Sequence, residues 1–263
     1  MQEKNAFTLI EMSIVLVVIG LVISGILLGQ TLISGYQIRA TMAQVEQFKT
    51  ASNTFKLKYN CLAGDCANAS SLLTGVSNGN GNNKIDGPSA VLNNEYFYFW
   101  QHLSIAGFIP GAYTSTPPGS VYASGVNFPA SKYGNGFSSW NSYNGGGFGA
   151  WNLQAYEGGG TFIGTGLLFP AKYGNTLMLG SPWPDLTVNV PIMNLFPGRD
   201  ARAIDLKFDD GLPAGGAIIS WAYSSEYGGE CASTDDPKTA VYLDTTGFDT
   251  YDARCILLFP GAF

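Results

Sequence analysis

The chain has few charged residues for its length. Lys, Arg, Asp and Glu make up 12% of its 263 residues, whereas about 25% is typical of soluble proteins. Disordered chains combine low hydrophobicity with high charge, so a composition with 13% aromatic residues excludes disorder and favours a packed, β-rich domain. The net charge of −6 disfavours binding to nucleic acid, which depends on basic residues that release counterions from phosphates. A local basic patch at Lys56 and Lys58 is the alternative.

The chain also lacks the residue sets that catalysis requires. It has one histidine, His102, and no nucleophile motif, phosphate-binding loop or metalloprotease motif accompanies it. The four cysteines form no CxxC pair, which disfavours a zinc site. We therefore predict that the protein is not an enzyme and that His102 is a packed structural residue.

No proline interrupts residues 7–59, and residues 7–28 are almost purely aliphatic. An apolar run of 18 or more residues predicts a transmembrane helix. A cleaved secretory signal has a shorter apolar core of roughly 7–15 residues, followed by an A-x-A-like site. Glu11 is the one charged residue in the run. Because a carboxylate at membrane depth costs roughly 2.5–3.5 kcal/mol, we predict that Glu11 has a functional partner.

After Leu28 the helical pattern becomes amphipathic. Apolar residues recur mostly at steps of three to five, and polar residues fill the positions between them. This pattern predicts one continuous helix over 7–59, whose second half carries a globular head over 60–263. The apolar stripe on that second half consists of Ile33, Ile38, Met42, Val45, Phe48, Phe55 and Tyr59.

The start of the chain carries a specific motif. A short polar leader, MQEKNA, runs into the sequence FTLIE at residues 7–11 and then into the aliphatic helix. This resembles the N-terminus of type IV pilins and of type II secretion pseudopilins. The resemblance implies that residues 1–6 are a leader peptide, that a prepilin peptidase cuts between Ala6 and Phe7, and that the new amine of Phe7 is methylated. The family usually has Gly before the cut, and Ala6 departs from that pattern.

The same resemblance implies partners and a location. It places the protein in the inner membrane with its head outside, and then in a periplasmic or extracellular filament built with other pilins at an inner-membrane assembly platform. It also implies that Glu11 of one subunit attracts the Phe7 amine of the next. Three further phrases, KYNCLAGDC, FWQHLSIAGFIPG and AIDLKFDDGLPAGG, resemble a secretion-type prepilin subgroup.

We predict an α+β head of the pilin kind, in which the long N-terminal helix packs on a C-terminal antiparallel sheet. A large loop-rich insertion is expected over 110–170, where Gly, Ser, Asn and aromatic residues are frequent. Its aromatic residues form either a secondary core or an exposed surface for a partner or glycan. The expected helices cover 95–106 and 199–211, and the expected strands cover 217–223, 239–244 and 254–259.

The four cysteines lie in two sequence-local pairs. Cys61 and Cys66 bracket a short turn after the long helix, and Cys231 and Cys255 bracket an excursion near residue 240. Three connectivities can be formed, and we predict the local one because each pair closes one excursion. A head exported beyond the inner membrane is in a compartment that permits disulfides. Free buried thiols are the alternative.

Two places offer oxygen ligands for Ca²⁺, the one cofactor that the sequence suggests. In the first, side-chain oxygens alternate along a loop as in a calcium-binding loop, but Ser89 stands where a Glu completes such a loop. In the second, carboxylates share a helix face and repel each other unless a cation neutralises them. A solvated turn and a solvated acidic face are the alternatives. The first set is Asn78, Asn80, Asn82 and Asp86, and the second is Asp205, Asp209 and Asp210.

Two functions fit the sequence. A structural subunit of a type IV pilus or type II secretion pseudopilus explains the apolar helix, Glu11, the disulfides and the missing catalytic residues. A membrane-anchored binding or adhesion module, such as a minor or tip pilin with an aromatic-rich head, explains the head but leaves Glu11 unexplained.

Overall fold

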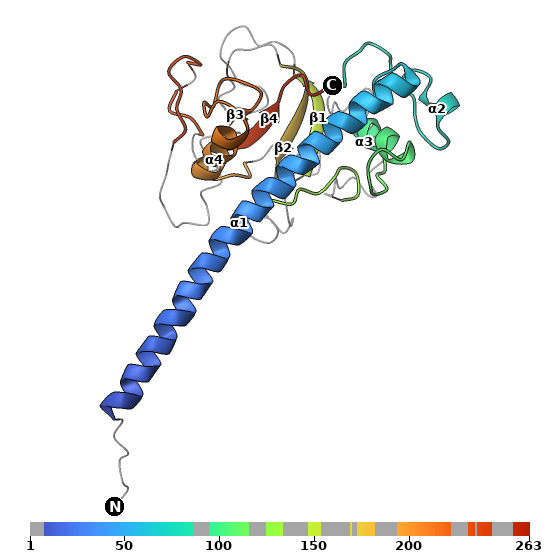
Figure 1. Ribbon diagram of the computed structural model, residues 1–263. Helices are drawn as coiled ribbons and strands as arrows, with labels where there is room; N and C mark the ends of the chain where they lie inside the picture. The colour runs from blue at the N-terminus through green and yellow to red at the C-terminus, as the bar shows by residue number, and fades with distance from the viewer. Residues whose placement is uncertain are drawn as a thin grey trace, which may run out of the picture.

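One long helix carries a small α+β head along its second half (Figure 1). This is the predicted fold class, and it is seen in a computed structural model. The structure describes residues 8–86, 95–115, 125–133, 147–153, 169, 173–181, 194–221, 231–234, 236–243 and 255–263. The helices are α1 (Leu9–Tyr59), α2 (Ala69–Leu72), α3 (Glu95–Ile105) and α4 (Gly198–Phe208), and the strands are β1 (Gly147–Leu153), β2 (Gly174–Gly180), β3 (Ile219–Trp221) and β4 (Ile256–Phe259).

Helix α1 runs without a break for 51 residues, which is roughly 76 Å at 1.5 Å per residue. It ends at Asn60, whose φ of 55° lies in the left-handed region. Asn adopts that conformation more readily than most residues, and its N–H donates to the carbonyl of Lys56 at 2.9 Å. This cap turns the chain away from the helix axis and into the head.

Only the second half of α1 packs against the head. The ring of Phe48 meets Trp100 of α3 edge-on, with ring centroids 5.0 Å apart. The expected stripe begins one turn too early, because Ile33 is 59% exposed and the part of the head that the structure describes does not reach it. The buried stripe consists of Ile38, Met42, Val45, Phe48, Ala51 and Phe55.

Helix α3 lies against α1 near the far end of that helix (Figure 1). It ends before Gly107, as the sequence predicts, and Gly107 has a φ of 76°, a conformation that costs glycine little because it has no Cβ. The helix is apolar on most of its surface, and this surface forms much of the core. Its buried apolar residues are Tyr96, Phe97, Phe99, Trp100 and Leu103.

The four strands form an antiparallel sheet in the order β1-β2-β4-β3. Strand β4 is central: Phe259 faces Leu177 of β2, and Leu258 faces Ile219 of β3. Helix α1 passes in front of the sheet in Figure 1, and Met42 of α1 and Phe259 line one groove. The core therefore lies between α1, α3 and this sheet.

The sheet differs from the predicted one in three ways. The expected strands at 217–223 and 254–259 correspond to β3, which begins two residues later than expected, and to β4, which ends at Phe259 as expected. The strand expected at 239–244 is wrong for its described residues, where Tyr242 makes only an isolated bridge to Ala232. Strands β1 and β2 were not predicted. Strand β1 lies in the insertion over 110–170, where the sequence indicates no particular strand. The last five residues of β2 are all buried, so it has no alternation of apolar and polar residues to reveal it.

Candidate functional site

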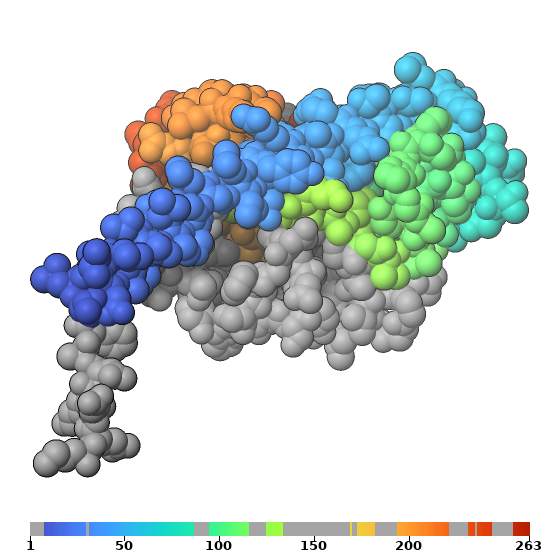
Figure 2. Space-filling model, turned by 60° about the horizontal axis from the view of Figure 1, so that its bottom comes forward, coloured from blue at the N-terminus to red at the C-terminus, as the bar shows by residue number. Residues whose placement is uncertain are grey.

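The N-terminal half of α1 is apolar and exposed on all sides. Figure 2 shows this blue segment projecting from the head, and Leu16 and Leu21 are 70% and 74% exposed. Its best 18-residue window has a mean hydropathy of 2.7, and none of that window is buried. By length and composition α1 is therefore able to cross a membrane. A surface of this kind marks a site for lipid or for other proteins.

Three glycines in this half leave room for a neighbouring helix. A Cβ built on Gly20, Gly25 or Gly29 would meet no atom of this chain within 4 Å, so the fold of the single chain does not require glycine there. Gly25 and Gly29 are one turn apart in a G-x-x-x-G pattern, which lets two apolar helices approach closely.

A reciprocal capping box starts α1. The N–H and the hydroxyl of Thr8 both donate to Oε2 of Glu11 at 2.8 Å, and the N–H of Glu11 donates to Oγ1 of Thr8 at 3.3 Å. Glu11 thus has a partner within its own chain that we did not predict, although the T-x-x-E pattern is the known signal for it. The predicted cleavage site, Ala6 and Phe7, lies outside the described residues.

Two disulfides stabilise the head, and they join the cysteine pairs that the sequence favours. Cys61 is bonded to Cys66, and Cys231 to Cys255, with Cα–Cα distances of 5.2 and 5.0 Å. The first bridge closes the turn that follows α1. The second connects the residue before β4 to the segment that pairs with Tyr242.

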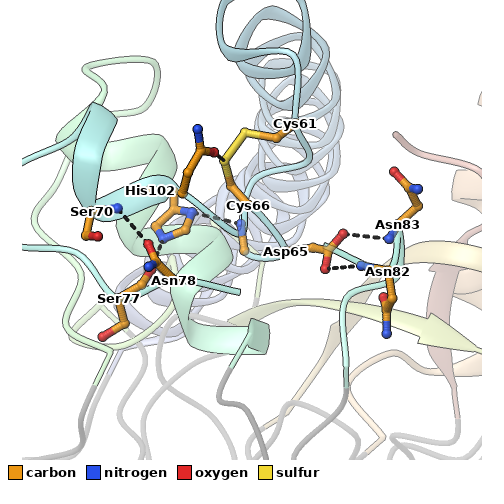
Figure 3. Close-up of a disulfide and its surroundings, with 11 residues drawn as sticks. Cys61, Asp65, Cys66, Ser70, Ser77, Asn78, Asn82, Asn83 and His102 are labelled. Atoms are coloured by element: carbon orange, nitrogen blue, oxygen red, sulfur yellow. Dashed lines mark hydrogen bonds between the residues drawn. A yellow bond between two sulfur atoms is a disulfide. The ribbon is translucent and has the colours of Figure 1, made fainter. Parts of the chain in front are cut away.

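His102 is a buried connector beside the first disulfide (Figure 3). Its Nδ1 accepts the N–H of Gly64 at 3.0 Å, so Nε2 carries the proton and donates to the carbonyl of Ser77 at 2.9 Å. Its ring stacks on Phe55 of α1 with centroids 6.0 Å apart. Burial lowers its pKa from 6.5 to about 4, and the bond to Ser77 opposes this shift. His102 is therefore neutral at pH 7 and holds two loops on α3.

The first candidate calcium loop folds around one carboxylate. Oδ2 of Asp86 accepts the amide groups of Asn80 at 2.6 Å and of Asn82 at 3.4 Å. Asn78 does not join this group, because its Oδ1 accepts the N–H of Ser70 at 2.8 Å (Figure 3). The structure thus brings together three of the four predicted ligand residues.

Two buried carboxylates that we did not predict, Asp65 and Glu95, hold the same loop. No local pattern reveals them, since they lie before and after the loop in sequence and approach it only in the fold. Within the described residues, no Lys or Arg nitrogen comes within 4.0 Å of either carboxylate or of Asp86. Asp65 accepts the N–H groups of Asn82 (2.9 Å) and Asn83 (2.7 Å), and Glu95 accepts those of Asn80 (2.7 Å) and Asp86 (2.9 Å).

Burial raises the pKa of Asp65 and of Glu95, and the N–H groups that they accept oppose the shift. Neighbouring carboxylates raise the pKa of both further. An oxygen-only set of this kind fits the ligand preference of Ca²⁺. The backbone bonds already satisfy Asp65 and Glu95, however, so calcium binding here stays a prediction.

The second candidate set lies at the end of α4, where one oxygen from each of Asp205, Asp209 and Asp210 comes within 4.8 Å of the others. Asp209 is not on the predicted helix face, because α4 ends at Phe208 and Asp209 has extended backbone. Burial raises the pKa of Asp205 to about 6. Each carboxylate already accepts hydrogen bonds: Asp205 from Gly211 and Tyr242, Asp209 from Ala217 and Ile218, and Asp210 from Leu212.

The aromatic-rich insertion over 110–170 lies largely outside the described residues. Of its aromatic side chains that are described, Tyr133 is buried, and its hydroxyl donates to Asp200 at 2.5 Å. The Tyr133 ring packs against Phe196 in the same core as α1 and the sheet, so the described residues show no separate secondary core. The alternative of an exposed aromatic surface stays a prediction.

The comparison with known proteins concerns the start of the chain. Residues 1–27 match a family model described as the prokaryotic N-terminal methylation motif, which is the signature of type IV pilins and pseudopilins. No curated protein and no solved structure matches the chain.

Proposed function

We propose, from the methylation motif at residues 1–27, that this protein is a structural subunit of a type IV pilus or a type II secretion pseudopilus. It enters the inner membrane as a prepilin with its head outside, and prepilin peptidase removes residues 1–6. The protein then leaves the membrane and joins a filament through α1. The observation that carries this proposal is the contrast between a packed head and a bare apolar half of α1.

The exposed apolar half of α1 requires an apolar environment both in the membrane-inserted protein and in the filament. Burying apolar surface stabilises a protein by roughly 25 cal/mol per Å², so helix residues that are 50–70% exposed, such as Val15, Leu16 and Val18, favour any apolar environment. Lipid supplies that cover before assembly, and the helices of neighbouring subunits supply it in the filament. The open faces of Gly25 and Gly29 support close approach of such helices.

Glu11 sets the axial register in this proposal. Both of its contacts to Thr8 use Oε2, and among the described residues nothing binds Oε1. Residues 12–38 contain no basic residue, so the cation nearest in sequence after cleavage is the new amine of Phe7. In a filament the amines of neighbouring subunits also become available. Removing one partner of a buried ion pair typically costs 3–5 kcal/mol, which is enough to reject a neighbour that is out of register.

The test compares wild type with Glu11→Gln and Glu11→Val for membrane level and for the yield of sheared filaments. Gln at this position keeps a capping-box partner for Thr8 but removes the charge, whereas Val removes both. Both variants should insert and form the two disulfides, and both should yield at least tenfold fewer filaments.

Assembly of Glu11→Gln at the wild-type yield would show that the cap, and not the charge, is what matters. Assembly of both variants at that yield would contradict the register contact. The alternative of a membrane-anchored binding or adhesion module, such as a minor or tip pilin, would then fit better.

A further inference from the structure

A groove lies at the base of the head, where α1 meets α4. Its volume is about 570 Å³, and Met42 of α1, Phe208 of α4 and Phe259 of β4 form apolar parts of its wall. In Figure 1, α4 lies beside the middle of α1, at the end of the head nearer the apolar half. Figure 2 shows the orange residues of this region against the blue helix. The groove therefore opens near the point where α1 leaves the head.

The groove has a positive rim. Arg39, Lys49 and Lys207 line it, and Glu46 is the one acidic residue among its described lining residues. Glu46 pairs with Lys49 at 3.1 Å, whereas no described carboxylate lies within 4.0 Å of Arg39 or Lys207. Two positive charges without an ion-pair partner among the described residues thus flank an apolar groove, and a neighbouring acidic group, Asp209, already accepts the N–H groups of Ala217 and Ile218 behind its wall. This combination suits a ligand that is both anionic and apolar.

The length of the uncharged segment places this groove close to the membrane. Residues 12–38 contain no Asp, Glu, Lys or Arg and span roughly 40 Å as a helix, whereas the hydrocarbon core is roughly 30 Å thick. A position that keeps both Glu11 and Arg39 out of the hydrocarbon leaves Arg39 at most about 10 Å from its edge. The headgroup layer occupies roughly the first 5–8 Å of that distance.

The surface around the groove has the composition of a membrane-interface surface. Tyr36 is 70% exposed one turn before Arg39, and tyrosines commonly lie at the headgroup level. On α4, Leu206 and Phe208 are exposed next to Lys207. Exposed apolar residues mixed with basic ones are typical of helices that lie in the interface.

We propose that this groove binds the headgroup of an anionic phospholipid in the outer leaflet of the inner membrane. Arg39 and Lys207 contact the phosphate, and Met42 and Phe208 contact the upper part of an acyl chain. The head of the inserted protein then rests on the membrane, and extraction into a filament breaks this contact. The inference rests on the membrane anchoring in the proposed function, and it does not depend on filament assembly.

The test places the full chain in lipid nanodiscs that carry a trace of photoactivatable phosphatidylglycerol or photoactivatable phosphatidylcholine. Cross-linked peptides are then mapped by mass spectrometry. We expect residues 39–49 and 202–212 to be labelled several-fold more by the anionic lipid. High salt should remove the preference, because the screening length falls from about 30 Å at 0.01 M to about 3 Å at 1 M.

A matched pair of variants tests the charges. Neutralising one basic residue near an anionic surface lowers lipid affinity about fivefold, so Arg39→Gln/Lys207→Gln should lose most of the anionic labelling at the groove. Lys56→Gln/Lys58→Gln changes the net charge equally at the far end of α1 and should keep it. Disulfide mapping verifies that each variant is folded, and single Lys207→Gln replaces the double variant if that one misfolds.

Two results would overturn the proposal: equal labelling of the groove by the two lipids, or equal loss of anionic labelling in the two double variants. Each of them leaves the filament proposal intact, because the nanodiscs hold single subunits. Conversely, a failure of the Glu11 variants to alter assembly leaves the lipid contact intact.

Discussion

The two halves of α1 belong to one continuous helix, but their side chains have different surroundings. Leu9–Leu28 has apolar side chains on nearly all sides, and these side chains are exposed. The half that follows residue 37 has one apolar stripe, and the head buries that stripe from Ile38 to Phe55. The hydrogen bonds within the helix are the same in both. What distinguishes the halves is whether the chain supplies its own apolar environment.

This difference means that the two halves of α1 are stabilised by different partners. The stripe of the second half is stabilised by α3 and the sheet, so substitutions there should act on the head. In the proposed function the first half is stabilised by lipid or by other subunits, so substitutions there should act on insertion and assembly. The predictions below test how completely the two halves are separated.

The largest expected effect is that of Phe55→Ala. Phe55 is fully buried against His102 and Phe108, and removing such a ring typically costs 3–5 kcal/mol. The matched control is Leu21→Ala, which truncates an exposed apolar residue in the other half. Thermal unfolding of the detergent-solubilised protein, followed by near-UV circular dichroism, should show a large loss for the first variant and none for the second. Equal losses would mean that the halves are not separate.

The next effect concerns the disulfides, which should stabilise the head and not the membrane half. Cys231 and Cys255 are 24 residues apart, and the chain-entropy model assigns such a bridge about 3–4 kcal/mol. Cys61 and Cys66 are five apart, for which the same model gives about 2 kcal/mol. Urea unfolding of the two Cys→Ala double variants should therefore rank them in that order. A non-reducing peptide that links Cys66 to Cys231 would contradict the pairing itself.

A third prediction uses His102, which lies behind the packed half of α1. Its pKa is about 4 in the fold and 6.5 without the fold, so the unfolded chain takes up a proton first as the pH falls. The contribution of the neutral ring is fully present above pH 6.5 and is lost between pH 6.5 and 4, by about 3 kcal/mol. The raised pKa values of Asp65 and Glu95 act in the opposite direction, so wild type must be compared with a variant that keeps both carboxylates.

That variant is His102→Gln, which retains an acceptor for Gly64 and a donor for Ser77 but does not titrate. Between pH 6.5 and 4 the wild-type head should lose about 3 kcal/mol more free energy of unfolding than the variant. The measurement is urea unfolding at several pH values. Parallel pH profiles would show that His102 is not the group that titrates.

A fourth prediction concerns calcium, which would act on the head alone. A ligand at 100 times its dissociation constant adds about 2.7 kcal/mol, and the loop around Asp86 or the cluster at Asp205 would be its site. Melting temperatures in millimolar CaCl₂ and in EDTA test this. Asp86→Asn and Asp210→Asn distinguish the two sites, and identical melting temperatures in both buffers would rule out calcium binding at either.

The parts of the fold that depend on long patterns could be predicted from the sequence. The span of α1 follows from an apolar run and a stripe with no proline between them, and the end of α3 follows from Gly107. The end of α4 was placed too late, because Asp209 and Asp210 fit a helical pattern, whereas in the fold they accept the N–H groups of Ala217 and Leu212 in the turn that follows. Strand β2 escaped prediction because burial of its residues removes the alternation that marks a strand.

The candidate site was predictable only where its signal is local. The FTLIE motif predicts an assembly role for Glu11, and the spacing of the cysteines predicted the two disulfides. Thr8 could have been predicted as the partner of Glu11 from the capping-box pattern. Asp65 and Glu95 could not, because each is an ordinary acidic residue until the turn after α1 and the start of α3 converge on the loop at 80–86.

The position of β4 near the end of the sequence delays completion of the sheet during synthesis of the chain. The strand that completes the centre of the sheet follows Phe55 by roughly 200 residues, so the side of α1 that faces Phe259 waits roughly 10–40 s for β4 at about 5–20 residues per second. During that time the head-facing side of α1 is exposed next to the apolar N-terminal half of the same helix, whose composition favours lipid. If the chain is exported as proposed, this order of synthesis favours protection of that side of α1 by a chaperone or by the membrane surface until β4 arrives.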